Sequence, residues 1–164
     1  MSDPPGTLAV MATWNQIVTE APQFAQRVRD VFDVRKHKTM ATLRADGSPR
    51  ISGIEIEFGP DEVRFGSMPD ARKAHDLRRD PRLAVHSPTV DPPEGDAAGW
   101  AGEAKITGRA VAEPTDPPPP DTPPGGRFHI DISEVVLTYL DEAGTHLVIE
   151  SWHPGRGWER RTRE

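Results

Sequence analysis

The spacing of apolar residues changes character near residue 38. Between residues 13 and 34 apolar side chains recur at helical intervals, and Thr13 is suited to cap the first turn. Pro22 interrupts this stretch, so the pattern predicts two short helices instead of one long helix. The apolar stripe of the second helix consists of Phe24, Val28, Val31 and Phe32.

After Lys38 the period becomes that of β-strands. Residues 39–58 contain two β-rich runs around Asp46-Gly47, which is a strong hairpin signal. In the second run, Ile54, Ile56 and Phe58 alternate with glutamates. A third run covers residues 62–67. Together these runs predict three antiparallel strands.

A short helix follows over residues 68–80, with Pro69 in its first turn and Asp80-Pro81 as its stop. Further strands are predicted at 82–87, 100–113, 129–140 and 145–152. The total is six or seven strands joined by hairpins, each with one apolar face. This pattern favours a mainly β fold, a closed antiparallel barrel with a few α-helices.

The length of 164 residues allows one domain of ordinary size. We expect a disordered segment over residues 1–12 and a single domain over 13–164. Seven of the eleven residues from Pro114 to Pro124 are proline, which cannot pair in a sheet. Residues 114–126 are therefore predicted to form an inserted loop.

The composition of the chain excludes several kinds of partner and of active site. The net charge of −6 argues against nonspecific binding to nucleic acid or anionic membranes, and no apolar run is long enough to span a bilayer. The first residues lack a signal-peptide pattern, so we expect a cytoplasmic protein. The absence of cysteine excludes disulfides, cysteine-ligated metals and thiol nucleophiles.

The segment from Ser67 to Leu77 carries the main candidate site. A helix N-terminus presents free N–H groups and the positive end of its dipole, yet Arg72 and Lys73 lie in its first turn. A bound phosphate would explain two cations at that end; alternatively, both are solvated surface residues. Arg50 and Ser52 share the inward face of the preceding hairpin, although Arg50 can also reach solvent.

The C-terminal residues combine aromatic and basic side chains. Trp152 ends a strand, and beyond it Trp158, Arg160 and Arg161 offer a positively charged stacking surface. Such a cluster suits either a flat anionic ligand or a dimer interface. The six histidines show no metal-binding spacing, and no nucleophile elbow or nucleotide-binding glycine motif is present. No metal site is predicted, and catalytic residues remain unassigned.

Three segments in this order (HKTMATLRADGSPRISGIEIEF, VRFGSMPDARKAHDLRRDPRLAVHS and HLVIESWHPGRGWERR) resemble the split-barrel pyridoxamine 5′-phosphate oxidase-like family of flavin and deazaflavin oxidoreductases. The resemblance spans about residues 37–161. It implies a six-stranded antiparallel split barrel, Greek-key-like and of the FMN-binding type, and a homodimer with the cofactor at the subunit interface. The cofactor-binding residues that the resemblance implies are Arg50, Ile51, Ser52, Gly53, Ser67, Met68, Arg72, Lys73, Trp152 and Arg161.

In this resemblance Arg72 and Lys73 hold the phosphate, and Trp152 and Arg161 reach in from the other subunit. The implied function is an oxidoreductase that transfers hydride between FMN and a small organic substrate. Alternatives are dependence on coenzyme F-420 and a non-catalytic module that binds flavin or haem. Two departures from the family pattern matter: Asp70-Ala71 replaces a Gly-Ser pair, and Glu159 replaces the substrate-binding histidine, which disfavours vitamin B6 oxidation.

Overall fold

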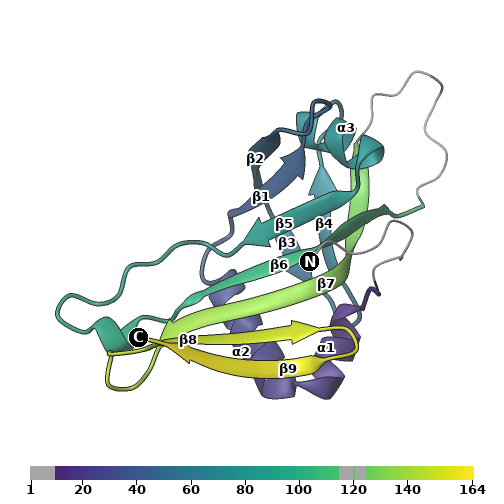
Figure 1. The fold of residues 1–164 in the computed structure, drawn as a ribbon. Helices are drawn as coiled ribbons and strands as arrows, with labels where there is room; N and C mark the ends of the chain where they lie inside the picture. The colour runs from purple at the N-terminus through teal and green to yellow at the C-terminus, as the bar shows by residue number, and fades with distance from the viewer. Residues whose placement is uncertain (1–9, 115–119, 121–124) are drawn as a thin grey trace.

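A computed structural model describes residues 10–114, 120 and 125–164 (Figure 1). β-strands are the commonest regular structure in the described chain, which also contains three α-helices and one 3-10 helix. No helix in these ranges is long and apolar enough to cross a membrane. The elements in chain order are α1 (Trp14–Glu20), α2 (Pro22–Asp33), β1 (Lys38–Leu43), β2 (Pro49–Ile54), β3 (Ile56–Phe58), β4 (Val63–Ser67), α3 (Arg72–Arg79), β5 (Arg82–His86), η1 (Ala97–Gly99), β6 (Glu103–Ala112), β7 (Gly126–Leu140), β8 (Leu147–His153) and β9 (Gly157–Arg163).

The nine strands form one sheet in which every pairing is antiparallel. The main path runs β2-β1-β5-β6-β7-β4-β3, and β8 and β9 continue from β7. Strand β7 is 15 residues long, and β6 pairs with most of one edge. The other edge of β7 pairs with β4 through residues 126–129 and with β8 through residues 135–140. The sheet therefore divides along β7, which gives the split shape seen in Figure 1.

The predicted fold class is confirmed, whereas the predicted six or seven strands were too few. The run over residues 49–58 is broken at Glu55, because β2 pairs with β1 while β3 turns to pair with β4. The C-terminal segment beyond Trp152, where no strand was predicted, forms β9 and pairs with β8 over its whole length. These two changes raise the strand number to nine.

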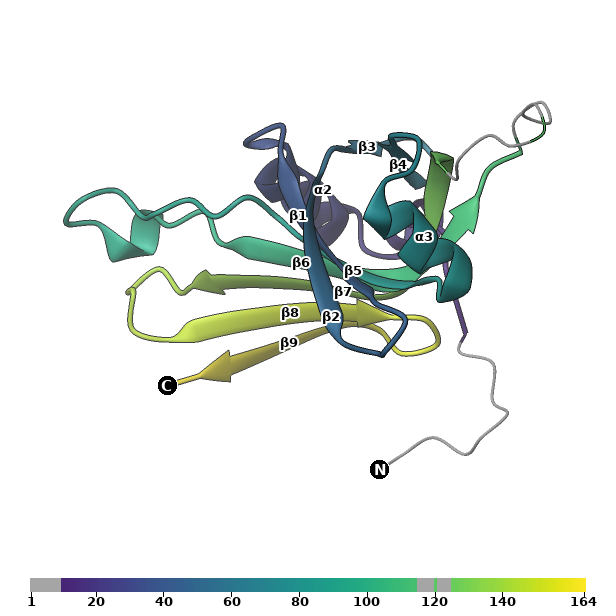
Figure 2. The same cartoon turned by 90° about the horizontal axis from the view of Figure 1, so that it is seen from above.

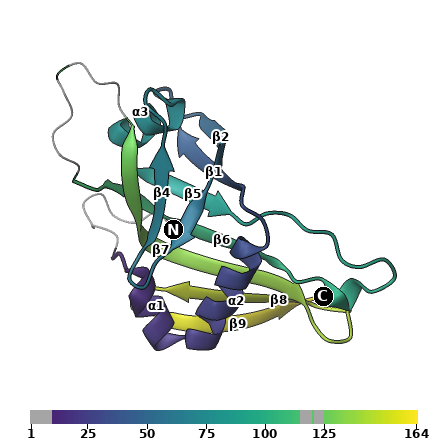
Figure 3. The same cartoon turned by 180° about the vertical axis from the view of Figure 1, so that it is seen from behind.

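Helices α1 and α2 cover one face of the sheet near β7 and β8 (Figure 3). As predicted, the Thr13 hydroxyl accepts a hydrogen bond from the backbone N–H of Gln16, and Pro22 opens the second helix. The apolar stripe of α2 is buried. Trp14 on α1 contacts Phe58 on β3 edge to face, with ring centroids 4.8 Å apart, which joins the helices to the barrel core.

The N-terminal segment differs in part from the expectation of disorder over residues 1–12. Residues 1–9 lie outside the described ranges. Ala12, however, is buried and exchanges two backbone hydrogen bonds of 2.8 Å with Ile132. Ala12 thus pairs with β7 between the part of that strand that pairs with β4 and the part that pairs with β8. Most of the predicted loop 114–126 also lies outside the described residues.

A bulge in β7 leads to a prediction about stability. The register with β6 shifts between Thr107 and Gly108, which leaves Ser133 without an opposite residue. A Cβ atom at Gly108 would lie far inside van der Waals contact with the Asp131 carbonyl oxygen. We expect Gly108→Ala to lower the free energy of unfolding by about 2 kcal/mol, as overpacking does in cores. Chemical denaturation measures this, with Gly53→Ala as the control because a Cβ there meets nothing within 4 Å. An equal loss in both variants would contradict it.

Candidate functional site

Most of the predicted cofactor-binding residues come together at one end of the sheet. Arg50, Ile51, Ser52 and Gly53 lie on β2, whereas Ser67 ends β4 and is followed by Met68. Arg72 and Lys73 open α3, which lies beside β1 and β2 (Figures 1 and 2). The two parts are joined directly, because Arg50 on β2 contacts Asp76 on α3.

The first turn of α3 carries two cations, Arg72 and Lys73. The cap residue of the helix is Ala71, which provides no side-chain hydrogen bond, and its first turn contains no acidic residue. Within the described ranges, neither Arg72 nor Lys73 forms an ion pair or a side-chain hydrogen bond. The free N–H groups of the first turn and two cations therefore lie at the positive end of the helix dipole, where cations destabilise the helix itself.

Asp76 fixes the position of Arg50. Its side chain is 3% exposed, and its Oδ2 accepts hydrogen bonds of 2.7 Å from Arg50 Nε and from the Thr42 hydroxyl. Its Oδ1 accepts a bond of 3.1 Å from Arg79. Burial raises the pKa of Asp76, but the hydrogen bonds from Arg50, Thr42 and Arg79 outweigh burial and lower the pKa to about 2. Asp76 is therefore a buried carboxylate ion that binds two arginines.

This arrangement leaves the outer part of Arg50 available. Only Nε is bound to Asp76, and the two terminal nitrogens have no hydrogen-bond partner among the described residues. The guanidinium is rigid and planar, so fixing Nε also fixes the direction of the other donors. The sequence analysis missed Asp76. The sequence feature that could have revealed it is a carboxylate between Ala74 and Leu77, which are the apolar residues of a short helix.

Asp70 lies immediately before α3 in an unusual conformation. Its φ of 62° makes it the one non-glycine residue with positive φ in the described part of the chain. Its carboxylate Oδ1 lies 2.8 Å from His75 Nε2, on the next turn of α3. The sequence departure at Asp70 thus places a carboxylate near the helix start, within hydrogen-bond distance of His75.

Two apolar side chains are exposed beside this polar group. Ile51 is 74% exposed and Met68 is 78% exposed. Ser52 is half-buried and shares the inward face of β2 with Arg50 and Ile54, as predicted from parity. The end of the sheet at α3 therefore combines cations, hydroxyl groups and uncovered apolar surface.

Trp152 does not join this group. It is fully buried in the hydrophobic core of its own chain, and its indole N–H donates a hydrogen bond of 3.0 Å to Glu20 on α1. Because its ring and its polar atom are both engaged, it has no surface to offer a cofactor held by another subunit. This burial argues against the predicted contact between Trp152 and a cofactor, which stays a prediction, and we omit Trp152 from the candidate site.

Arg161 lies on β9, at the opposite end of the molecule from α3 (Figure 1). Its side chain is 77% exposed, and the ion pair formed with Glu159 is long, at 3.8 Å. Contact between Arg161 and a cofactor held by another copy of the chain therefore stays a prediction.

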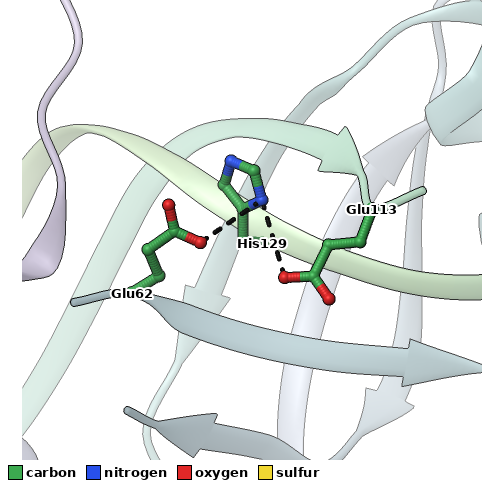
Figure 4. Close-up of side chains that lie close together, drawn as sticks. All are labelled: Glu62, Glu113 and His129. Carbon is green, nitrogen blue, oxygen red and sulfur yellow. Dashed lines mark ion pairs between the residues drawn. The ribbon is translucent and has the colours of Figure 1, made fainter. Parts of the chain in front are cut away.

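A separate cluster joins a histidine and two glutamates (Figure 4). His129 Nδ1 lies 3.4 Å from Glu62 and 3.7 Å from Glu113, and three possible metal-ligand atoms lie within 4.8 Å of one another. However, Arg64 donates to Glu113 at 2.6 Å and lies 3.3 Å from Glu62. Because the Arg64 guanidinium already pairs with both carboxylates, we assign the cluster to ion pairing beside the strand ends.

Comparisons with known proteins bear on the fold. No family model matches the sequence, and no curated protein matches it. Among solved structures, a pyridoxamine 5′-phosphate oxidase-related, FMN-binding protein from Nostoc punctiforme PCC 73102 is 10% identical, with a TM-score of 0.59 over 88% of this chain and 96% of that one. PhzG from Burkholderia lata 383, in complex with tetrahydrophenazine-1-carboxylic acid, is 14% identical, with a TM-score of 0.60 over 97% of this chain and 100% of that one.

These likenesses cover nearly the whole chain and nearly the whole of each neighbour. At this low identity they establish the fold. The chain therefore has the split-barrel fold found in pyridoxamine 5′-phosphate oxidase-related proteins.

Proposed function

We propose that the chain is an oxidoreductase that binds FMN as a homodimer, with the FMN phosphate at the N-terminus of α3. The observation that carries the proposal is the pair of cations, Arg72 and Lys73, on an uncapped helix start. Free backbone N–H groups and a positive dipole end form a common anion site. The fold supports the proposal, because the Nostoc neighbour is described as FMN-binding.

The charges of the site fit a phosphate dianion. Asp76 neutralises one of its two arginine partners, so Arg50, Arg79 and Asp76 together carry one net positive charge. Arg72 and Lys73 add two more, and the carboxylate of Asp70 removes one, so the group carries a net charge of +2. A phosphate with two negative charges would remove most of the repulsion within this group. The free terminal nitrogens of Arg50 suit a two-pronged contact with phosphate or with a polar ring edge.

The uncovered apolar side chains fit the remainder of the cofactor. Ile51 and Met68 are too exposed to contribute to the core of one chain. A planar ring system and a second copy of the chain would remove both from water. Hiding apolar surface of this kind contributes about 25 cal/mol per Å². Gly53, with open space above it, would allow close approach of the ring.

When bound, FMN would supply hydride transfer at the flavin ring. The side chains described above would bind and orient the cofactor: Lys73 and Arg72 the phosphate, and Arg50 with the hydroxyls of Ser52 and Ser67 its polar edges. The proposed substrate is a small organic molecule that meets the exposed face of the ring.

Replacing Lys73 tests the phosphate site. We expect Lys73→Ala to weaken FMN binding by about 1–3 kcal/mol, because a charge-assisted hydrogen bond is lost. Fluorescence titration of the purified apoprotein measures the affinity. Lys36→Ala is the matched control, since it removes an exposed lysine that pairs with Glu55 outside the site. Equal affinities of the wild type and Lys73→Ala would contradict the proposed phosphate contact.

The same titration separates the possible cofactors. Coenzyme F-420 also carries phosphate and a planar ring. Tight binding of F-420 with no binding of FMN would therefore identify the deazaflavin as the cofactor. Saturable binding of neither would reject the proposal. Cofactor binding without turnover of any electron donor or acceptor would indicate a non-catalytic binding module.

A further inference from the structure

A cavity lies far from the proposed cofactor site. It has a volume of about 320 Å³ and is formed where the α1–α2 junction faces β8 and β9. This volume falls in the range of small-molecule sites. Figures 1 and 3 show these elements at the opposite end of the molecule from α3. The side chains that decide its chemistry are Glu20, Pro22, Phe24, Arg27, Glu150 and Trp158.

The cavity has an aromatic wall that is held in place. Trp158 is 46% exposed, although most large apolar side chains of the described chain are buried. Its indole N–H donates a hydrogen bond of 2.9 Å to Glu150, which is itself 4% exposed. The ring therefore has a fixed orientation while part of its surface stays accessible. Phe24, from α2, contributes a buried apolar wall.

Two of the three charged side chains in the cavity neutralise each other. Arg27 donates to Glu150 at 2.7 Å, and its guanidinium also lies 4.2 Å from the centre of the Tyr139 ring. These contacts engage Arg27 with a carboxylate and an aromatic face. An incoming anion would have to compete with Glu150, so the cavity is poorly suited to anions.

Glu20 is the third charged group, and it has no cationic partner among the described residues. Its two carboxylate oxygens accept hydrogen bonds from neutral donors, Trp152 Nε1 at 3.0 Å and Gln16 Nε2 at 3.2 Å. Each oxygen retains a second lone pair. The net charge of the cavity is therefore −1, located on a carboxylate whose position is fixed by a buried tryptophan.

We propose that this cavity binds a small organic cation, an ammonium group carried on an apolar or aromatic body. Glu20 supplies the opposite charge, and the accessible face of Trp158 supplies the negative side of an aromatic quadrupole. Pro22 and Phe24 contact the apolar body. This assignment uses none of the residues of the proposed FMN site and stands independently of it.

The probe for this site is phenethylammonium, with 2-phenylethanol as its neutral counterpart. Nuclear magnetic resonance of the ¹⁵N-labelled full chain reports the four indole N–H groups separately. We expect saturable shifts of the Trp152 and Trp158 signals, with Trp14 and Trp100 as internal references. The ammonium compound should bind about tenfold more tightly than the alcohol, because only the cation can make both a cation–π contact with Trp158 and an ion pair with Glu20.

Two variants locate the interaction. Glu20→Gln should weaken phenethylammonium binding about threefold and narrow its advantage over the alcohol, because only the contact with Trp158 remains. Trp158→Leu should weaken it similarly, with Trp152 as the remaining reporter. Glu142→Gln is the control, because Glu142 is exposed on the turn between β7 and β8.

Equal binding of the ammonium compound and the alcohol to the wild type would overturn the proposal, as would unsaturable shifts. Unchanged affinity in both Glu20→Gln and Trp158→Leu would also overturn it. If one variant fails to fold, the other and the comparison of the two probes still decide the result.

Discussion

Trp152→Ala is expected to lower the free energy of unfolding by about 3–5 kcal/mol, the range measured for large aromatic residues removed from protein cores. Trp152 is fully buried, and its indole N–H donates to Glu20. The substitution would leave a cavity between β8 and α1 and a carboxylate without one of its donors. Denaturation in urea, with and without FMN, measures the effect.

Two controls show which part of Trp152 matters. Trp152→Phe keeps most of the ring but removes the N–H group, so a smaller loss of about 1–2 kcal/mol is expected. Trp158→Ala removes a half-exposed tryptophan on the neighbouring strand β9 and should cost less than Trp152→Ala. If Trp152 contacted a cofactor in another subunit, its loss would matter chiefly in the presence of flavin. That outcome would contradict its burial in the core.

Asp76→Asn is expected to lower the free energy of unfolding by about 3 kcal/mol, because it leaves Arg50 and Arg79 next to a neutral amide. For a domain of this size the melting temperature should fall by roughly 6–12 °C. FMN affinity should fall as well, since Arg50 would lose the contact that sets its direction. Asp30→Asn, a change at an exposed carboxylate on α2, is the control.

The same carboxylate predicts a dependence on pH. Its pKa is about 2 in the folded chain, below the ordinary aspartate value of 3.8. Asp76 therefore stabilises the fold fully above pH 4, and this contribution is lost as the pH falls through 2. Denaturation curves between pH 4 and pH 2 should show this loss in the wild type and less of it in Asp76→Asn. Identical pH dependence of the two proteins would contradict the role assigned to Asp76.

The features predicted correctly from the sequence are those that depend on neighbouring residues. The Thr13 cap is a contact between residues three apart, and the Asp46-Gly47 turn is closed by hydrogen bonds from Ser48 to Asp46. Gly47 adopts the positive φ of 84° that this turn requires. Such signals can be read locally because both partners lie within a few positions.

The features missed depend on distant partners. The break at Glu55 is set by β1 on one side and β4 on the other, which no local pattern records. Strand β9 has one apolar residue, Trp158, and forms because β8 offers an unpaired edge. The burial of Trp152 and of Asp76 likewise depends on α1 and β2, so their roles follow from the packing of these elements.

The bridge between Ala12 and Ile132 constrains the order in which the chain can assemble. Most of the strands lie between Ala12 and Ile132 in the sequence. Contacts between residues so far apart in the chain form slowly. As the polypeptide emerges from the ribosome, α1 and α2 are complete long before the middle of β7 exists. The segment at Ala12 must therefore wait for β7, so its docking belongs among the last steps of folding.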